Sequence, residues 1–151
     1  MQGNLLGIFV TEQKSMDMTE VDFAEAVAGK GIAGDRYCKS AGTFSKSEKI
    51  RDITLIEIET IWALKRDYQI DVEPRKLRRN LLTEGIALNH LVGKTLSIGD
   101  VILQGIELCE PCGYLSNMLD LPLKEALKHR GGLRCRIVQG GALALEQTVT
   151  A

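Results

Sequence analysis

The run Leu96–Leu103 constrains the fold of this chain more strongly than any other segment. Two stretches of alternating apolar and polar residues flank Gly99-Asp100, and this arrangement predicts a β-hairpin with a type II′ turn. Other short β-like runs, several of them ended by glycines, are Asn4–Val10, Leu133–Val138 and Ala142–Val149. We therefore predict a mainly β fold with short helices (α+β), built as a mainly antiparallel β-barrel or sandwich.

Helix signals are few, and the first follows an ambiguous segment. Residues 58–65 carry apolar side chains at helical spacing, and we expect Trp62 in the core. Thr54 with Glu57 fits a capping box at the start of that helix. The short run Ile53–Ile56 is equally consistent with a strand and with a first helical turn, so the boundary stays open.

Two further helices are predicted near the carboxyl end. One covers Gly113–Leu119, and the other covers Pro122–His129 and is ended by Gly131-Gly132. The polar segment Ser40–Arg51 is predicted to be an exposed, mobile loop, and Glu146–Ala151 to fray at the end of the chain.

Composition limits the classes of function. A length of 151 residues predicts one domain, residues 1–151, and a net charge of -1 argues against a nucleic-acid partner. No apolar run approaches the roughly 18 residues that span a bilayer, so we expect no membrane partner. The amino end lacks a basic signal-peptide region, which predicts a cytoplasmic protein whose four cysteines are thiols or ligands.

The segment Cys109-Glu110-Pro111-Cys112 concentrates the reactive chemistry of the sequence. It follows the β-like run Val101–Leu108 and precedes the predicted helix Gly113–Leu119. If Cys112 opens that helix, unpaired amides and the helix dipole lower the pKa of its thiol and favour thiolate. A thiolate attacks sulfur, carries a persulfide or binds a soft metal. The alternative is that Cys109 and Cys112 are two small buried apolar residues.

Two other chemistries fit this pair of cysteines. Structural zinc needs four ligands, and only single candidates accompany the pair: Cys38, His90, His129 and Cys135. A thioredoxin-like redox site also uses two cysteines at this spacing, but it requires a βαβ surround that the hairpin-rich pattern does not provide.

Positive charge is concentrated at Arg78-Arg79-Asn80, inside the apolar flanks Leu77 and Leu81. Arginine grips phosphate or carboxylate with a planar fork, and buried arginine needs a partner. A solvated pair of charges on a loop is the competing interpretation. The glycine turn that ends at Asp35-Arg36 is either stiffened by a salt bridge or turned toward a ligand. Arg134 and Arg136 share one strand face, which is either solvated or the wall of a pocket.

Taken together, the order and spacing of these segments resemble the MOSC domain, the module named for the carboxyl-terminal part of molybdenum cofactor sulfurases. The resemblance covers most of the chain and is similar to the small stand-alone bacterial type. The segments that carry it are Gly31–Arg36, Ile53–Glu57, Arg78–Leu82 with Gly85, Leu91–Lys94 with Ile98-Gly99, Cys109–Cys112, Arg130–Leu133 and Gly140-Gly141.

The resemblance implies a MOSC-like antiparallel β-barrel that binds a molybdenum cofactor (molybdopterin). It implies that Cys112 is the molybdenum ligand or a persulfide carrier, with Cys109 tuning it. Arg78, Arg79 and Asn80 lie where the family anchors its cofactor, and Arg36 is a further candidate for that pocket. Relatives that hold the cofactor permanently reduce N-hydroxylated compounds, which makes an oxidoreductase plausible.

The resemblance also bears on partners. We expect no pyridoxal-phosphate desulfurase domain before this domain and no ferredoxin-type cysteine set after it, so sulfur or electrons come from a partner, a cysteine desulfurase or a reductase. A third class of function is a thiol-redox or zinc-stabilised binding module that uses Cys109 and Cys112 without a pterin.

Overall fold

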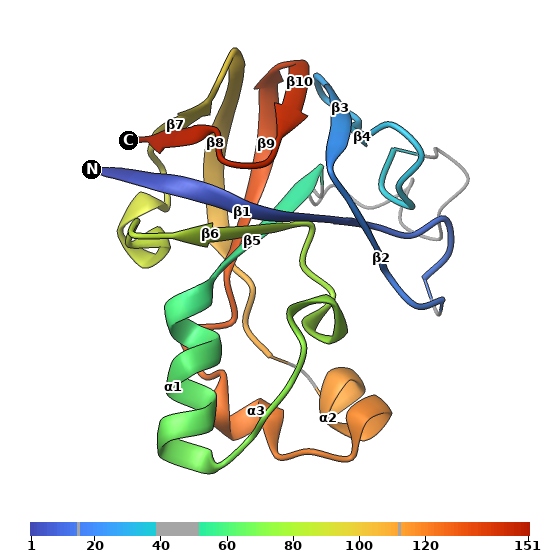
Figure 1. Ribbon diagram of the computed structural model, residues 1–151, viewed down its shortest axis with the longest axis vertical. Helices are drawn as coiled ribbons and strands as arrows, with labels where there is room; N and C mark the ends of the chain where they lie inside the picture. The colour runs from blue at the N-terminus through green and yellow to red at the C-terminus, as the bar shows by residue number, and fades with distance from the viewer. Residues whose placement is uncertain (15, 39–51, 112) are drawn as a thin grey trace.

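The computed structural model describes residues 1–14, 16–38, 52–111 and 113–151. Its strands are β1 (Gln2–Val10), β2 (Thr19–Val21), β3 (Phe23–Val27), β4 (Gly31–Ile32), β5 (Ile53–Glu57), β6 (Leu81–Glu84), β7 (Thr95–Ile98), β8 (Val101–Leu108), β9 (Leu133–Gln139), β10 (Gly141–Ala144) and β11 (Thr148–Thr150). The helices are α1 (Ile58–Tyr68), α2 (Gly113–Leu119) and α3 (Leu123–Ala126), with 3-10 turns η1 (Pro74–Leu77) and η2 (Leu88–Leu91) (Figure 1).

In the described part of the chain, seven strands close a barrel in the order β11-β7-β8-β9-β5-β6-β1, and β1 pairs back with β11. The strand β2 extends the sheet beyond the far end of β1, and a separate sheet has the order β10-β3-β4. The described strand pairs are antiparallel except β5 with β6, which are parallel and joined through α1. The mainly β, barrel-like fold predicted from the sequence is therefore confirmed.

The barrel is held by the alternation of its strands. Inward residues of β5 and β9 are fully buried, while the intervening ones point out of the barrel. The inner core comprises Leu5, Ile8, Ala24, Ala26, Ile32, Ile53, Leu55, Leu81, Ile86, Leu88, Leu91, Leu96, Ile98, Val101, Leu103, Leu133, Cys135, Ile137, Leu143 and Val149. The predicted hairpin is confirmed, because Ile98 pairs with Val101 and Gly99 takes a left-handed φ of 56° in the turn.

A second core lies outside the barrel, where α1, α2 and α3 gather at one end of the molecule (Figure 1). It contains Phe9, Met18, Ile56, Ile61, Leu64, Ile70, Val72, Leu77, Leu82, Leu115, Leu123, Ala126 and Leu127. Because outward residues of β5 and β6 pack here, one wall of the barrel is covered and its polar groups are cut off from water.

Two predictions for the first helix are wrong. Thr54 lies inside β5 and bonds to Asn80, while Glu57 is the residue before α1 and makes no side-chain cap, so no capping box forms. Trp62 is 56% exposed, because the buried face of α1 is formed by neighbours such as Leu64. Helical spacing gave the helix correctly but not the face that packs.

The carboxyl end also differs from its prediction. A single strand over Ala142–Val149 is wrong, because the chain turns at Glu146, where φ is 68°, and divides into β10 and β11. The expected fraying is wrong as well, since β11 lies between β1 and β7 and the amino terminus donates to the carbonyl of Ala151 at 2.8 Å.

The helices near the cysteine segment are short. The helix predicted at Gly113–Leu119 is confirmed as α2. The one predicted at Pro122–His129 is shorter, since α3 covers Leu123–Ala126. The loop predicted at Ser40–Arg51 lies outside the described residues.

Candidate functional site

The segment Arg78-Arg79-Asn80 links η1 to β6 on the covered outer wall of the barrel. Arg78 caps η1 in a left-handed conformation, with φ of 63°. This sharp reversal aims the side chains of consecutive residues at different neighbours, and each of the three has a distinct set of hydrogen bonds.

Asn80 forms the floor of this region. Its side chain is fully buried; Oδ1 accepts from the backbone N and from Oγ1 of Thr54, each at 3.1 Å, and Nδ2 donates to the carbonyl of Phe9 at 3.2 Å. The amide therefore ties the start of β6 to β5 and β1, directly after the two arginines.

Arg78 is 8% exposed and reaches the loop that follows β1. Its guanidinium donates to the carbonyl of Met16 at 2.6 Å and to the carbonyl of Lys14. Burial lowers the pKa of Arg78, and the nearby charge of Arg36 lowers it further. The positive charge is therefore held in place by dipoles, with a like charge beside it.

Arg36 is that neighbour. Its Nη2 donates to the carbonyl of Arg78 at 3.4 Å and to the hydroxyl of Tyr37 at 3.2 Å, and its guanidinium lies over the Tyr37 ring. A 3.4 Å ion pair joins it to Asp35, whose side chain is fully buried and also accepts from Thr11 N at 3.0 Å. The predicted salt bridge is present, and the same turn brings Arg36 to Arg78.

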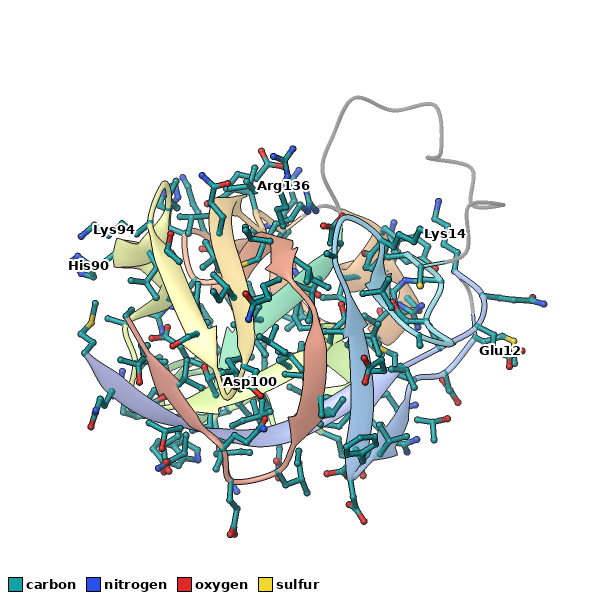
Figure 2. The ribbon with its side chains drawn as sticks, turned by 90° about the horizontal axis from the view of Figure 1, so that it is seen from above. Glu12, Lys14, His90, Lys94, Asp100 and Arg136 are labelled. Carbon is teal, nitrogen blue, oxygen red and sulfur yellow. The ribbon has the colours of Figure 1, made fainter. Side chains whose placement is uncertain are left out.

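Lys14 and Tyr114 complete this group of charges. The Lys14 Nζ lies 5.9 Å from the centroid of the Tyr114 ring, and Tyr114 also interacts electrostatically with Arg78. Tyr114 stands in the first turn of α2, directly after the cysteine segment. Figure 2 shows Lys14 on the side of the molecule opposite His90. Cys112 lies outside the described residues.

Arg79 points to a different neighbour from Arg78. Its Nε donates to the carbonyl of Gly131 at 2.7 Å, and its Nη1 donates to the carbonyl of Leu77 at 3.2 Å. A Cβ at Gly131 would lie 2.0 Å from the carbonyl oxygen of Cys109 and 3.6 Å from Arg79 Nη2. Arg79 and Cys109 thus flank the same glycine, Gly131. Arg78 and Arg79, although adjacent in sequence, share no hydrogen-bond partner among the described residues.

Cys109 is 3% exposed, and its backbone N donates to the carbonyl of Gly132 at 2.8 Å. Burial raises the pKa of the Cys135 thiol, and the neighbouring Cys109 and Asp52 raise it further. Cys135 therefore stays a protonated thiol inside the barrel, and Cys109 is buried near enough to influence it.

The next residue of the segment makes a separate contact. Glu110 accepts from the His129 backbone at 3.2 Å and lies 3.1 Å from His129 Nδ1. Burial acts to raise the pKa of Glu110, but the two His129 hydrogen bonds outweigh it and the pKa is lowered. This pair fixes the cysteine segment to the turn after α3.

Sequence reasoning missed Lys14, Tyr37 and Tyr114. Each contacts a predicted arginine or its partners, yet none carries a motif of its own, because Lys14, Tyr37 and Tyr114 come from segments far apart in the sequence. Arg36 had a local signal, the glycine turn that precedes it.

Two surface grooves border this region. One, of about 400 Å³, is lined by Val10, Thr11, Glu12, Met16, Asp17, Thr19 and Gly34. The other, of about 460 Å³, is lined by Glu110, Pro111, Lys124, Glu125 and Lys128. They lie on the loops that hold Arg78 and the cysteine segment, respectively.

Within residues 1–14, 16–38, 52–111 and 113–151, no group of three or more histidine, cysteine, aspartate or glutamate side chains could hold a metal ion. Among those same residues, no helix is long and apolar enough to cross a membrane.

Comparison with solved structures supports the fold. The YuaD protein from Bacillus subtilis superposes with a TM-score of 0.80 at 20% identity, over 99% of this chain and 94% of that chain. YiiM from Geobacillus stearothermophilus gives a TM-score of 0.74 at 16% identity, over 98% of this chain and 74% of that chain. YiiM from Escherichia coli gives 0.70 at 16% identity, over 99% and 69%.

Comparison at the level of sequence supplies the family. No curated protein matches this chain. The MOSC domain family model matches residues 45–150, a span that includes the arginine segment, the cysteine segment and the strands β5 to β11. This chain belongs to the MOSC domain family.

Proposed function

We propose that this protein binds the molybdenum cofactor at the site formed by Arg36, Arg78 and Arg79, with Cys112 as the reactive thiolate. The observation that carries the proposal is the meeting of two largely buried arginines: the Arg36 guanidinium donates to the backbone carbonyl of Arg78 at 3.4 Å, and, in addition to burial, its charge lowers the pKa of Arg78. Two like charges near each other, with one carboxylate, Asp35, paired to Arg36 by a 3.4 Å contact, favour binding of an anion.

The residues present fit the chemistry of this cofactor. Its phosphate is an oxyanion, and Arg36 and Arg78 are held by backbone and side-chain contacts before any ligand arrives. Tyr114 places an aromatic ring and a hydroxyl at the same site, at the start of α2. Asn80 directly follows the two arginines, and both its side-chain oxygen and its side-chain nitrogen are bonded to the protein.

The cysteines have different roles in this proposal. Cys109 is buried and tunes or resolves the reactive sulfur, while Cys112 is the metal ligand or carries a persulfide from a cysteine desulfurase. When bound, the cofactor supplies a two-electron redox centre suited to reducing N-hydroxylated compounds with electrons from a partner reductase. We place the protein in the cytoplasm, a reducing compartment in which Cys38, Cys109 and Cys135, free among the described residues, stay thiols.

The arginine part of the proposal is tested by cofactor content. Protein is purified from a host that makes the cofactor, and bound pterin is measured as its fluorescent oxidation product. We expect Arg36→Gln to lower pterin content about tenfold, the effect of losing one hydrogen bond to a charged group. Arg78→Lys should also lose pterin, because it keeps the charge and loses the fork.

The matched control is Arg75→Gln. Arg75 lies on η1 close to Arg78, but it is exposed and paired to Glu73 at 2.9 Å. Its loss changes the net charge equally and should leave pterin content unchanged. Equal pterin in Arg36→Gln, Arg78→Lys and Arg75→Gln, with circular dichroism showing folded protein, would exclude these arginines from the site.

The thiolate part is tested separately. Molybdenum should be lost from Cys112→Ser and retained in Cys109→Ser if Cys112 is the ligand. A sulfane-sulfur assay after incubation with a cysteine desulfurase distinguishes the carrier role, which requires labelled sulfur on Cys112. Zinc in place of molybdenum, with no pterin, would instead support a thiol-redox or zinc-stabilised module.

A further inference from the structure

Arg134 lies on the outer face of β9, where it is partly buried. Its neighbours on β9, Leu133 and Cys135, are fully buried in the barrel core, so alternation directs Arg134 outward. It pairs in register with Thr54 of β5 on one side and Glu107 of β8 on the other. Residues directly opposite in antiparallel strands share a face, so the three side chains form a row.

That row leads to the candidate site. Thr54 bonds to Asn80, which carries Arg78 and Arg79 immediately before it. At the other end, β8 continues past Glu107 into Cys109. Arg79 also donates to the carbonyl of Gly131, in the turn that leads into β9. Arg134 is thus flanked by the strands that lead to Asn80 and Cys109, and it follows the turn that Arg79 contacts.

The hydrogen bonds of Arg134 are incomplete. Its Nη1 donates to Glu107 Oε1 at 2.6 Å, and its side chain is 20% exposed. Its Nε is buried and has no hydrogen-bond partner among the described residues. A buried charged donor without an acceptor opposes folding, and such a group in a native protein calls for an explanation, such as a bound ion or a functional role.

We infer that the Nε–H of Arg134 binds an anionic oxygen of the ligand held at this site, as an additional guanidinium contact beyond Arg36, Arg78 and Arg79. This inference deepens the proposed function and rests on it for the identity of the ligand. The ligand chemistry is that of a tetrahedral oxyanion, which phosphate and molybdate share. Glu107 holds the far end of the fork, so the free N–H is oriented before the ligand arrives.

A purely structural role makes the opposite prediction. If Arg134 served only the ion pair with Glu107, its removal would weaken folding and leave anion binding intact. Glu107 is 48% exposed at its side chain, so water can replace that partner. A ligand role predicts that removing the Arg134 side chain leaves the stability of the protein equal or higher and weakens its binding of the anion.

The test uses full-length protein from a host that lacks the cofactor, titrated separately with inorganic phosphate and with molybdate by calorimetry. We expect Arg134→Gln and Arg134→Lys to weaken binding about tenfold, because neither provides the Nε–H. The control is Arg136→Gln: Arg136 is on the same strand and face but exposed, at the outer edge in Figure 2, so binding should change less than twofold. The anion that binds more tightly to the unsubstituted protein identifies which oxyanion the site selects.

Urea unfolding of the same proteins completes the test, with the Arg134→Gln midpoint expected at or above that of the unsubstituted protein. Unchanged anion affinity in Arg134→Gln, equal losses in Arg134→Gln and Arg136→Gln, or no saturable binding of either anion overturns the inference. Failure of the proposed function is a separate result: pterin is then missing from protein made in a cofactor-producing host, even where anion binding depends on Arg134.

Discussion

The side-chain oxygen of Asn80 accepts hydrogen bonds from both the backbone N and Oγ1 of Thr54, each 3.1 Å long. The amide nitrogen donates to the carbonyl of Phe9, and the whole side chain is buried. One residue therefore joins three strands directly beneath the candidate arginines. Its loss would move the wall on which the site is built.

Asn80→Ala should lower the free energy of unfolding by about 3 kcal/mol, because it leaves buried donors of Thr54 and the carbonyl of Phe9 unpaired. Urea unfolding measures this directly. Asn89→Ala is the matched control, since Asn89 is exposed and donates one hydrogen bond to the carbonyl of His129. This variant should lower the free energy of unfolding by about 0.5 kcal/mol. Similar losses in the two variants would contradict a special role for Asn80.

Gly131→Ala should destabilise the protein by about 3 kcal/mol, the scale of overpacking in a close-packed region. The added Cβ would lie 2.0 Å from the carbonyl oxygen of Cys109, a backbone atom that can move only if the chain shifts. Gly113→Ala is the comparison, because the nearest atom to its Cβ is 3.9 Å away. Chemical denaturation of both variants checks the difference, and a harmless Gly131→Ala would show that this approach is not tight.

Asp52 gives a pH dependence with a defined sign. Burial raises its pKa, and the 2.9 Å bond from Ile137 N and the charge of Arg136 offset that rise only in part. The folded protein then holds this proton more tightly than the unfolded chain. The contribution to stability is present below the ordinary Asp pKa and is lost as the pH rises through the raised value.

Asp52→Asn removes this titration and keeps an oxygen that can accept from Ile137. We compare the unfolding free energy of this variant with that of the unsubstituted protein between about pH 3 and about pH 8. The difference should shift in favour of the variant as the pH rises, and the shift should occur only above the ordinary Asp pKa. Urea unfolding across that range measures it. Asp100→Asn, at an exposed turn labelled in Figure 2, controls for the loss of one charge. A constant difference across the range would refute the raised pKa.

The surface of α1 supplies a further prediction. Trp62 is 56% exposed, so Trp62→Ala should change stability by about 0.5 kcal/mol or less. Leu64, in the same helix, is fully buried in the second core, and Leu64→Ala should cost about 3 kcal/mol. Thermal unfolding compares the two, and a larger loss at Trp62 would mean that its ring is covered.

The sequence specified those parts of the fold whose signals are local. The hairpin around Gly99 and the strand Leu133–Gln139 follow from period-two alternation, and α2 follows from a short helical run. The split between β10 and β11 could not be foreseen, because Glu146 adopts its left-handed turn without a glycine or proline signal. The position of each half depends on partners that are distant in sequence. The strand β11 pairs with β1 and β7, and β10 pairs with β3.

The candidate site divides in the same way. Arg36 and Arg78 were found from their residue types and flanks, but their contact depends on two loops that meet only in the folded barrel. Asn80 is predicted from its residue type to hold part of the pterin, and nothing in the sequence indicates its hydrogen bonds to Thr54 and Phe9. Alternation predicts that Arg134 shares a strand face with Arg136, but it does not predict which residues lie beside that face.

If this site holds a molybdenum cofactor, protein purified from a host that synthesises the cofactor should contain molybdenum and pterin in equal molar amounts. Elemental analysis and pterin fluorescence on the same sample measure both. Folded protein that contains neither molybdenum nor pterin would show that the site does not hold the cofactor.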